Sequence, residues 1–323
     1  MRWKLDAKAP IAVTPAVSAD RVVIGTLGGR VLGVDLAGAV AWSFDAHDRV
    51  YGSPLIVGDA AWVGVDGGAL VSLALRDGKP RARVATKGDA DGAAAPLGDG
   101  VVFCATRLVV ALDARGRERW SWKAKRKHFT PPAITEDGDV IVAGQDDRVT
   151  RLSGRDGTVK WRALVDADAD GGPAIADDGT IYAGTDGGEV IALEPHTGNV
   201  KWRRAVGGFV RGGITVARDG AVIVGVHGPK PAIVALDAYG GEIFRVVVPG
   251  TGAKEHGVRG GPIEDAEGTL VFGGQDDRVV ALDRDGHERW SVRVDGDVDG
   301  TLALSEGVVY VATYGGSLYA LGD

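Results

Sequence analysis

The amino-acid sequence repeats one short pattern eight times: an apolar segment that ends in an aliphatic residue, which a small residue precedes in seven of the eight copies. The aliphatic positions are Val34, Leu73, Leu112, Leu152, Leu193, Leu236, Leu282 and Leu321. Successive positions are 39 to 46 residues apart, close to the repeat of about 40–45 residues that is typical of a four-stranded propeller blade. The spacing therefore predicts an all-β fold, an eight-bladed β-propeller of four-stranded antiparallel blades.

Short strands separated by glycine-rich turns are expected within each repeat, because the chain contains 51 glycines. The fifth repeat shows the pattern most clearly, with strands predicted over residues 180–184, 188–193 and 199–204. The sequence Asp186-Gly187 between the first two predicts a primed hairpin turn, whose central residues need positive φ.

An aromatic residue follows most of the aliphatic positions by eight or nine residues. The column consists of Trp42, Trp120, Trp161, Trp202, Phe244 and Trp290, and the second repeat departs from it with Arg81. A flat side chain repeated at one position indicates packing between neighbouring blades, with the indole N–H bonded to a backbone acceptor. Stacking on a ligand is the alternative interpretation.

The eighth repeat ends at residue 323, before its aromatic strand. Residues 1–5 supply that strand, with Trp3 in the aromatic position, so the N-terminal strand is expected to complete the C-terminal blade and close the ring. We expect a single domain over residues 1–323. The expected blades are 11–44, 51–84, 91–122, 129–163, 170–204, 211–247, 259–292, and 299–321 together with 2–5.

Charge and hydropathy exclude several classes of partner. The formal net charge of −7 argues against nucleic acid or an anionic membrane as the main partner, and no apolar run is long enough to insert into a bilayer. Residues 1–6 lack the apolar segment of a signal peptide, so the chain as written is expected in the cytoplasm, and a trimmed chain could belong outside it. Cys104 is the single cysteine and is expected to be buried and inert.

The repeats resemble those of the pyrroloquinoline-quinone-type propeller family. The resemblance rests on the motifs at residues 172–175, 180–184, 189–193 and 200–202, and it extends over essentially the whole chain. That family includes quinoprotein dehydrogenases, receptor and kinase sensor domains, and small non-enzymatic scaffolds such as the lipoprotein of the outer-membrane β-barrel assembly machinery. The chain is most similar to the scaffolds, because it has neither the adjacent cysteine pair nor the long inserted loops of the dehydrogenases. The resemblance implies a monomer that binds protein partners and holds no quinone.

Charged residues recur just before the first strand of each blade, where the segments should meet at one mouth of the central channel. The candidate binding residues there are Asp91, Asp170, Arg211, Arg259 and Asp299, with Arg49, His128 and His256 close by. A charged ring that binds a ligand or partner is one interpretation. Solvated turn residues that share a column are the other.

Two of these segments also match the opening of a calcium-binding loop. The matching residues are Asp166, Asp168 and Asp170 in one segment and Asp295, Asp297 and Asp299 in the other. An extended strand follows each segment and would carry the twelfth residue of the loop roughly 15–20 Å from an ion. We therefore expect neither calcium nor another metal there.

Catalytic motifs are not evident. No nucleophile elbow occurs, and the six histidines are expected in surface turns of different blades. The basic segment 123–128 and the long loops 226–231 and 249–258 are either partner surfaces or solvated connections. These observations favour a non-catalytic scaffold that binds proteins. The alternatives are a ligand-sensing domain of a longer receptor or kinase, and a quinone- or metal-dependent enzyme that uses the channel mouth.

Overall fold

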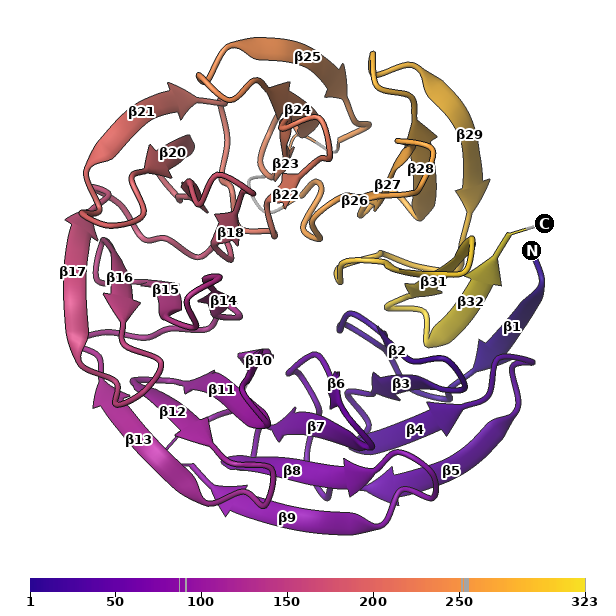
Figure 1. The fold of residues 1–323 in the computed structure, drawn as a ribbon. Coiled ribbons are helices and arrows are strands. Elements are labelled where there is room, and N and C mark those ends of the chain that lie inside the picture. Colours follow the sequence, from indigo (N-terminus) through magenta and orange to yellow (C-terminus); the bar gives the residue numbers. More distant parts are fainter. Residues whose placement is uncertain (87, 91, 251, 253–255, 323) are drawn as a thin grey trace. The chain divides into compact units, whose positions relative to one another are not determined.

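The computed structural model describes the chain except for residues 87, 91, 251, 253–255 and 323. The described residues form eight four-stranded antiparallel sheets and no helix, so none can cross a membrane as a helix (Figure 1). The predicted class, an eight-bladed β-propeller, is confirmed. The chain divides into two compact units, residues 1–132 with 302–323, and residues 133–301.

The first unit contains four of the sheets. Its strands are β1 (Trp3–Asp6), β2 (Ala16–Val17), β3 (Val22–Gly25), β4 (Arg30–Val34), β5 (Val40–Asp45), β6 (Leu55–Val57), β7 (Ala60–Val65), β8 (Ala69–Ala74), β9 (Pro80–Ala85), β10 (Ala94–Leu97), β11 (Gly100–Ala105), β12 (Leu108–Leu112), β13 (Glu118–Lys123), β30 (Ala303–Ser305), β31 (Val308–Ala312) and β32 (Ser317–Leu321). Each sheet is formed by consecutive strands, except that β1 joins β32, β31 and β30.

The second unit contains the other four sheets, each of four consecutive strands. They are β14 (Ala133–Ile134), β15 (Val140–Gly144), β16 (Arg148–Leu152), β17 (Val159–Leu164), β18 (Ala174–Ile175), β19 (Ile181–Gly184), β20 (Glu189–Leu193), β21 (Val200–Ala205), β22 (Thr215–Val216), β23 (Val222–Val226), β24 (Ala232–Leu236), β25 (Glu242–Val247), β26 (Ile263–Glu264), β27 (Leu270–Gly273), β28 (Arg278–Leu282) and β29 (Glu288–Arg293). We number the blades 1 to 8 from the sheet that begins with β2 to the sheet that begins with β30.

The core lies between neighbouring sheets. Every residue of the second strand β15 is buried, whereas the fourth strand β21 alternates between exposed and half-buried residues. Ile141 and Val149 of blade 4 pack with Ile181 and Ile191 of blade 5 in one apolar cluster. Inner strands are therefore continuous apolar runs, because both of their faces are covered.

The hairpin turns differ from the sequence prediction. In the turn of residues 185–188 only Gly188 has positive φ, 80°, and its N–H donates to the carbonyl of Thr185 at 3.1 Å. This is a type I turn followed by one left-handed residue, so the prediction of a primed turn at Asp186-Gly187 was wrong. Blades 4 and 7 place Asp147 and Asp277 in the left-handed position, with φ of 57° and 59°, which aspartate tolerates better than most residues.

The aromatic column lies on the fourth strands, opposite a small residue of the third strand in every blade that has the aromatic residue except blade 4, where Trp161 lies opposite Arg151. Trp42 pairs with Gly33 and Trp202 with Ala192. In blade 2 the residue opposite Ser72 is Ala82, so the assignment of Arg81 to this column was wrong. The same β-bulge between the third and fourth strands occurs in blades 1 to 7, so it is not the cause. The turn before the fourth strand is one residue longer in blade 2 than in blade 1, since Leu73 pairs with Pro80 whereas Val34 pairs with Val40, and Arg81 instead forms an ion pair with Asp59.

These aromatic rings join one blade to the next. The Nε1 atoms of Trp42, Trp161 and Trp202 donate to carbonyl oxygens in turns of the following blades, each at 2.8 Å. A left-handed glycine of the same turn lies against the ring. A Cβ atom at Gly198, whose φ is 72°, would lie 2.6 Å from Trp161. Glycine is therefore required there both by the backbone and by the ring.

The N-terminal strand completes the C-terminal blade, as predicted. Trp3 of β1 pairs with Ala320 of β32, and the two strands lie side by side in Figure 1. The indole N–H of Trp3 donates to the carbonyl of Leu36 in blade 1 at 2.8 Å. Strand β1 thus covers the edge of β32 and contributes the aromatic contact to the next blade.

Candidate functional site

The segments that precede the first strands of the second unit run side by side, and glycines allow their close approach. A Cβ atom at Gly212 would lie 2.4 Å from the carbonyl oxygen of Arg259, and one at Gly260 would lie 2.5 Å from that of Gly300. Four of the predicted residues stand on these neighbouring segments, and we call them the charged row: Asp170, Arg211, Arg259 and Asp299. The fifth, Asp91, lies outside the described residues.

Arg211 is held rigidly within this row. Its Nε and Nη2 atoms donate to the two carboxylate oxygens of Asp186, at 2.9 and 2.7 Å. Its guanidinium carbon also lies 4.5 Å from the centre of the Phe209 ring. The bidentate pair and the ring fix this side chain, which is only 23% exposed.

Arg259 is the more accessible arginine. Its side chain is 42% exposed, whereas that of its ion-pair partner Asp299, 3.5 Å away, is 9% exposed. Asp299 also accepts a hydrogen bond from Nε2 of Gln275 at 2.8 Å. A buried carboxylate therefore orients a guanidinium that solvent and partners can reach.

Gln275 connects the charged row to the two long loops, a role that the sequence analysis missed. Its Oε1 accepts from the N–H of Gly257 at 3.0 Å and lies 3.2 Å from Nε2 of His227. The N–H of Gly228 donates to the carbonyl of His256 at 2.7 Å, which joins the loops to each other. Blade 4 repeats part of this arrangement, since Gln145 donates to Asp170 at 3.1 Å.

Two of the six histidines are buried, which corrects the expectation that all lie in surface turns. His128 is 0% exposed and His227 is 2% exposed. The N–H of His128 donates to the carbonyl of Thr106 at 2.7 Å, and its ring lies edge-on to Trp122 at 5.7 Å. His128 therefore offers little surface to a partner, although the preceding basic residues 125–127 are exposed.

The remaining predicted residues near the row have separate surroundings. Arg49 belongs to the first unit and pairs with Asp66 at 2.9 Å. His256 is half-buried beside the described part of its loop, and Lys254 lies outside the described residues.

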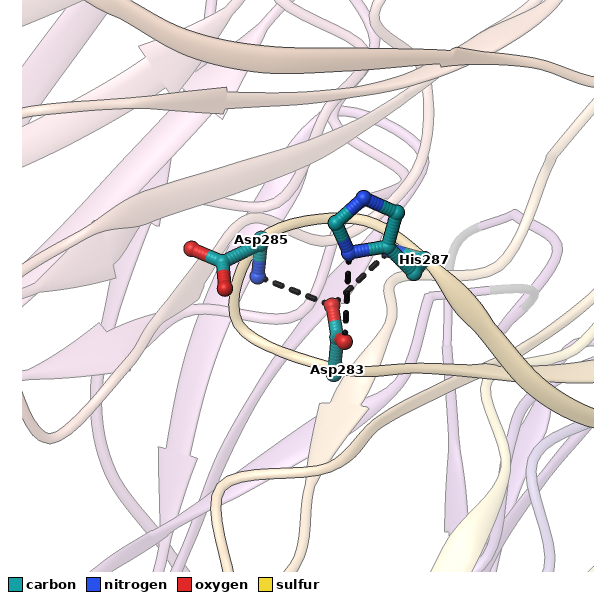
Figure 2. Close-up of side chains that lie close together, drawn as sticks. All are labelled: Asp283, Asp285 and His287. Carbon is teal, nitrogen blue, oxygen red and sulfur yellow. Dashed lines mark hydrogen bonds and ion pairs between the residues drawn. The ribbon is translucent and has the colours of Figure 1, made fainter.

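Three of the acidic residues considered as calcium ligands bind different side chains of the protein. Asp166 forms an ion pair with Arg203 at 3.0 Å, and Asp170 and Asp299 accept from glutamines. Within the described chain, the one trio of possible ligand atoms that all lie within 4.8 Å of one another is at Asp283, Asp285 and His287 (Figure 2).

That trio is part of a turn between the third and fourth strands. Oδ1 of Asp283 accepts from the N–H groups of Asp285 and His287, at 3.0 and 2.8 Å (Figure 2). The hydrogen bond from the His287 N–H is the main cause that lowers the pKa of Asp283. Asp35 and Asp113 accept the same two backbone bonds in their own blades, so the arrangement caps a recurring turn.

Two carboxyl groups near the charged row carry unfavourable charge. Burial raises the pKa of Asp276 and of Asp297, and the negative charges of Asp299, Asp277 and Asp276 raise that of Asp297 further. At neutral pH the ionised Asp297 therefore costs the folded state free energy that the unfolded chain does not bear.

Asp297→Asn is expected to stabilise the protein at pH 7, raising Tm by about 1–2 °C. The advantage should disappear below the ordinary aspartate pKa of 3.8, where the carboxyl is neutral in both the folded and the unfolded chain. Thermal unfolding across pH measures the effect, with Asp285→Asn in an exposed turn of blade 7 as the control. A Tm gain that persists at low pH would contradict the electrostatic cause.

Comparison with known proteins gives one family and several solved structures. The family described as outer membrane protein assembly factor BamB matches residues 1–99, 82–206, 164–244 and 229–322. No curated protein matches the sequence. BamB from Moraxella catarrhalis has a TM-score of 0.83 and 22% identity, over 98% of this chain and 95% of that chain.

Two other similar structures have unrelated descriptions. The computationally designed Ika8 protein has a TM-score of 0.82 and 16% identity, over 98% of each chain. Quinohemoprotein alcohol dehydrogenase from Comamonas testosteroni has a TM-score of 0.82 and 15% identity, over 99% of this chain and 75% of that chain. At such identities these structures show a shared fold, and a fold alone does not assign an activity.

Proposed function

The chain belongs to the family described as outer membrane protein assembly factor BamB, which matches it from residue 1 to residue 322, and we propose that it is a non-catalytic scaffold that binds proteins. The exposed guanidinium of Arg259, oriented by the buried carboxylate of Asp299, carries the proposal. Arginine is enriched among the residues that dominate binding energy at protein interfaces, and a fixed guanidinium loses little entropy when it binds.

The chemistry of the site supports binding over catalysis. Arg211 is held by a bidentate pair with Asp186, and the ring of His227 is buried against Gln275. Burial raises the pKa of the Cys104 thiol to about 12, so this group is not a nucleophile at neutral pH. The groups that reach solvent are charged side chains on a rigid base, a surface suited to a partner with complementary charge.

The proposed partner is a protein of outer-membrane assembly that presents a carboxylate to Arg259. Its complex would place that carboxylate on the guanidinium edge that Asp299 leaves free. The pyrroloquinoline quinone and calcium of the enzymatic alternative are not part of this proposal.

Arg259→Glu is expected to lower the affinity for such a partner at least about tenfold, since it replaces an attraction by a repulsion. Proteins retained from a cell-envelope extract by the immobilised chain would be quantified by mass spectrometry and then titrated individually. Arg293→Glu is the matched control, because Arg293 is an exposed residue of the fourth strand β29 and undergoes the same charge change.

Equal retention by both variants would contradict the assignment of the site. A saturable rise in Tm with pyrroloquinoline quinone and calcium, accompanied by a change in quinone absorbance, would instead favour the enzymatic alternative.

A further inference from the structure

We propose that the groove between blades 4 and 5 binds a short segment of a partner protein, and that this segment contains both basic and apolar side chains. The groove has a volume of about 760 Å³ and is open to solvent. This volume falls in the range of about 300–1,000 Å³ that is typical of ligand-binding clefts. It lies at the ends of first strands β14 and β18, whereas the charged row lies before the beginnings of such strands, so it is a separate surface.

Apolar side chains form the floor of the groove and carboxylates line its rim. The apolar residues are Ile134, Ile175, Ala176 and Pro195, and the acidic ones are Glu136, Asp137, Asp177 and Asp178. Lysine and arginine combine an apolar stem with a cationic head, so a chain that carries them matches both parts.

One acidic position of the rim distinguishes these two blades from blades 6 and 7. Glu136 and Asp177 occupy the same position in the turns between the first and second strands of blades 4 and 5. The equivalent residues are Arg218 in blade 6 and Ala266 in blade 7. The propeller fold does not require a carboxylate at this position, so two neighbouring ones are a feature of this groove.

The two rim carboxylates also carry uncompensated charge. Both side chains are exposed, and neither forms an ion pair within the described part of the chain. By contrast, Asp137 is paired with Arg151 and Asp178 with Lys201, at 2.6 and 3.6 Å. Glu136 and Asp177 are therefore the groups available to a cation.

A buried arginine gives the groove a fixed width. Arg151, whose side chain is 4% exposed, donates from Nη1 to the carbonyl of Pro195 and from Nη2 to Asp137, at 2.7 and 2.6 Å. Pro195 belongs to blade 5 and Asp137 to blade 4, so one guanidinium holds both walls. Asp139 accepts from its Nε at 2.7 Å, so the guanidinium is shared between this buried carboxylate and Asp137, and it pairs with neither Glu136 nor Asp177.

Charge and shape together select a peptide over other occupants. Nucleic acid would bring phosphates against four carboxylates, which is unfavourable. A small polyamine would satisfy the rim but leave the apolar floor in water. A peptide in which lysine alternates with leucine satisfies both.

Binding of a fluorescently labelled peptide in which leucine alternates with lysine, followed by anisotropy, tests this inference. Saturable binding is expected, with affinity lowered at least about tenfold by Glu136→Lys and by Asp177→Lys. Glu267→Lys is the matched control, because Glu267 is exposed in the same turn of blade 7 and undergoes the same charge change. The control should bind like the unaltered protein.

Each remaining outcome has a defined meaning. Failure of the unaltered protein to saturate, or equal loss of affinity in the control, would overturn the inference. Displacement of the peptide by spermidine at equal affinity would also overturn it, since the site would then be one for small polyamines. Arg259→Glu should leave peptide binding unchanged, so this inference and the proposed function can fail independently.

Discussion

Deletion of residues 1–5 is expected to lower the free energy of unfolding by about 3–5 kcal/mol, the cost of removing a packed tryptophan. Trp3 and Leu5 pack against the apolar cluster that contains Tyr310 and Leu318. The deletion also removes most of the β1–β32 ladder and leaves the edge of β32 unpaired. Thermal and denaturant unfolding would measure the loss.

Two controls separate the causes of this loss. Trp3→Phe keeps an aromatic ring but removes the indole N–H that binds the Leu36 carbonyl, so it should cost only part of the total. A synthetic peptide of residues 1–8 should restore stability to the shortened protein in a concentration-dependent way. Unchanged unfolding after the deletion would refute the structural role of the strand.

Arg151→Ala is expected to destabilise the protein by about 3–5 kcal/mol, because it leaves the carboxylate of Asp139 buried without its main partner. The Asp139 side chain is 6% exposed and would retain the ion pair with Lys160, at 2.5 Å, and the hydrogen bond from the N–H of Gly154, at 3.3 Å. Denaturant unfolding measures the change. A loss below about 1 kcal/mol would mean that this buried pair contributes no more to stability than an exposed ion pair, which would contradict the prediction.

The equivalent residues of blade 5 suggest a second substitution that should offset the loss caused by Arg151→Ala. There Thr180 and Ala192 occupy the positions of Asp139 and Arg151, and Lys201 donates to Oγ1 of Thr180 at 2.7 Å. The double variant Arg151→Ala with Asp139→Thr reproduces this arrangement in blade 4, without the buried carboxylate and guanidinium. It should recover most of the stability, because a buried ion pair contributes little once neither charge is left alone.

Repetition made the fold predictable from the sequence. One blade alone would have left its strands uncertain, whereas eight spaced copies fixed the number of sheets and identified β1 as the strand missing from the last one. The pairing of individual residues within a blade was harder to predict from the sequence. Ala82 occupies the aromatic column because the turn before the fourth strand is one residue longer in blade 2 than in blade 1. Spacings of eight and of nine residues both occur among the aromatic positions, so counting residues could not decide between Arg81 and Ala82.

The sequence indicated which candidate residues precede the first strands, but not which contacts their side chains make. Comparison of equivalent positions in the repeats placed Arg211 and Arg259 before their strands. The two arginine side chains differ in solvent exposure because one pairs with Asp186 and the other with Asp299, and these contacts depend on side-chain packing. The sequence did carry one unused signal. The segments 144–149 and 274–279 are identical and place Gln145 and Gln275 where each binds the next aspartate of the row.

The contact of each aromatic residue with the following blade also bears on how the chain folds. The indole hydrogen bonds join residues only 33 to 36 positions apart, so docking of one blade on the next closes a short loop. Assembly can then propagate along the chain from neighbour to neighbour, as in a solenoid. The pairing of β1 with β32 is different, because it joins opposite ends of the sequence and has the highest contact order in the molecule's described ladders. That ladder should form late, and its formation would convert a string of locally docked sheets into a cooperative unit.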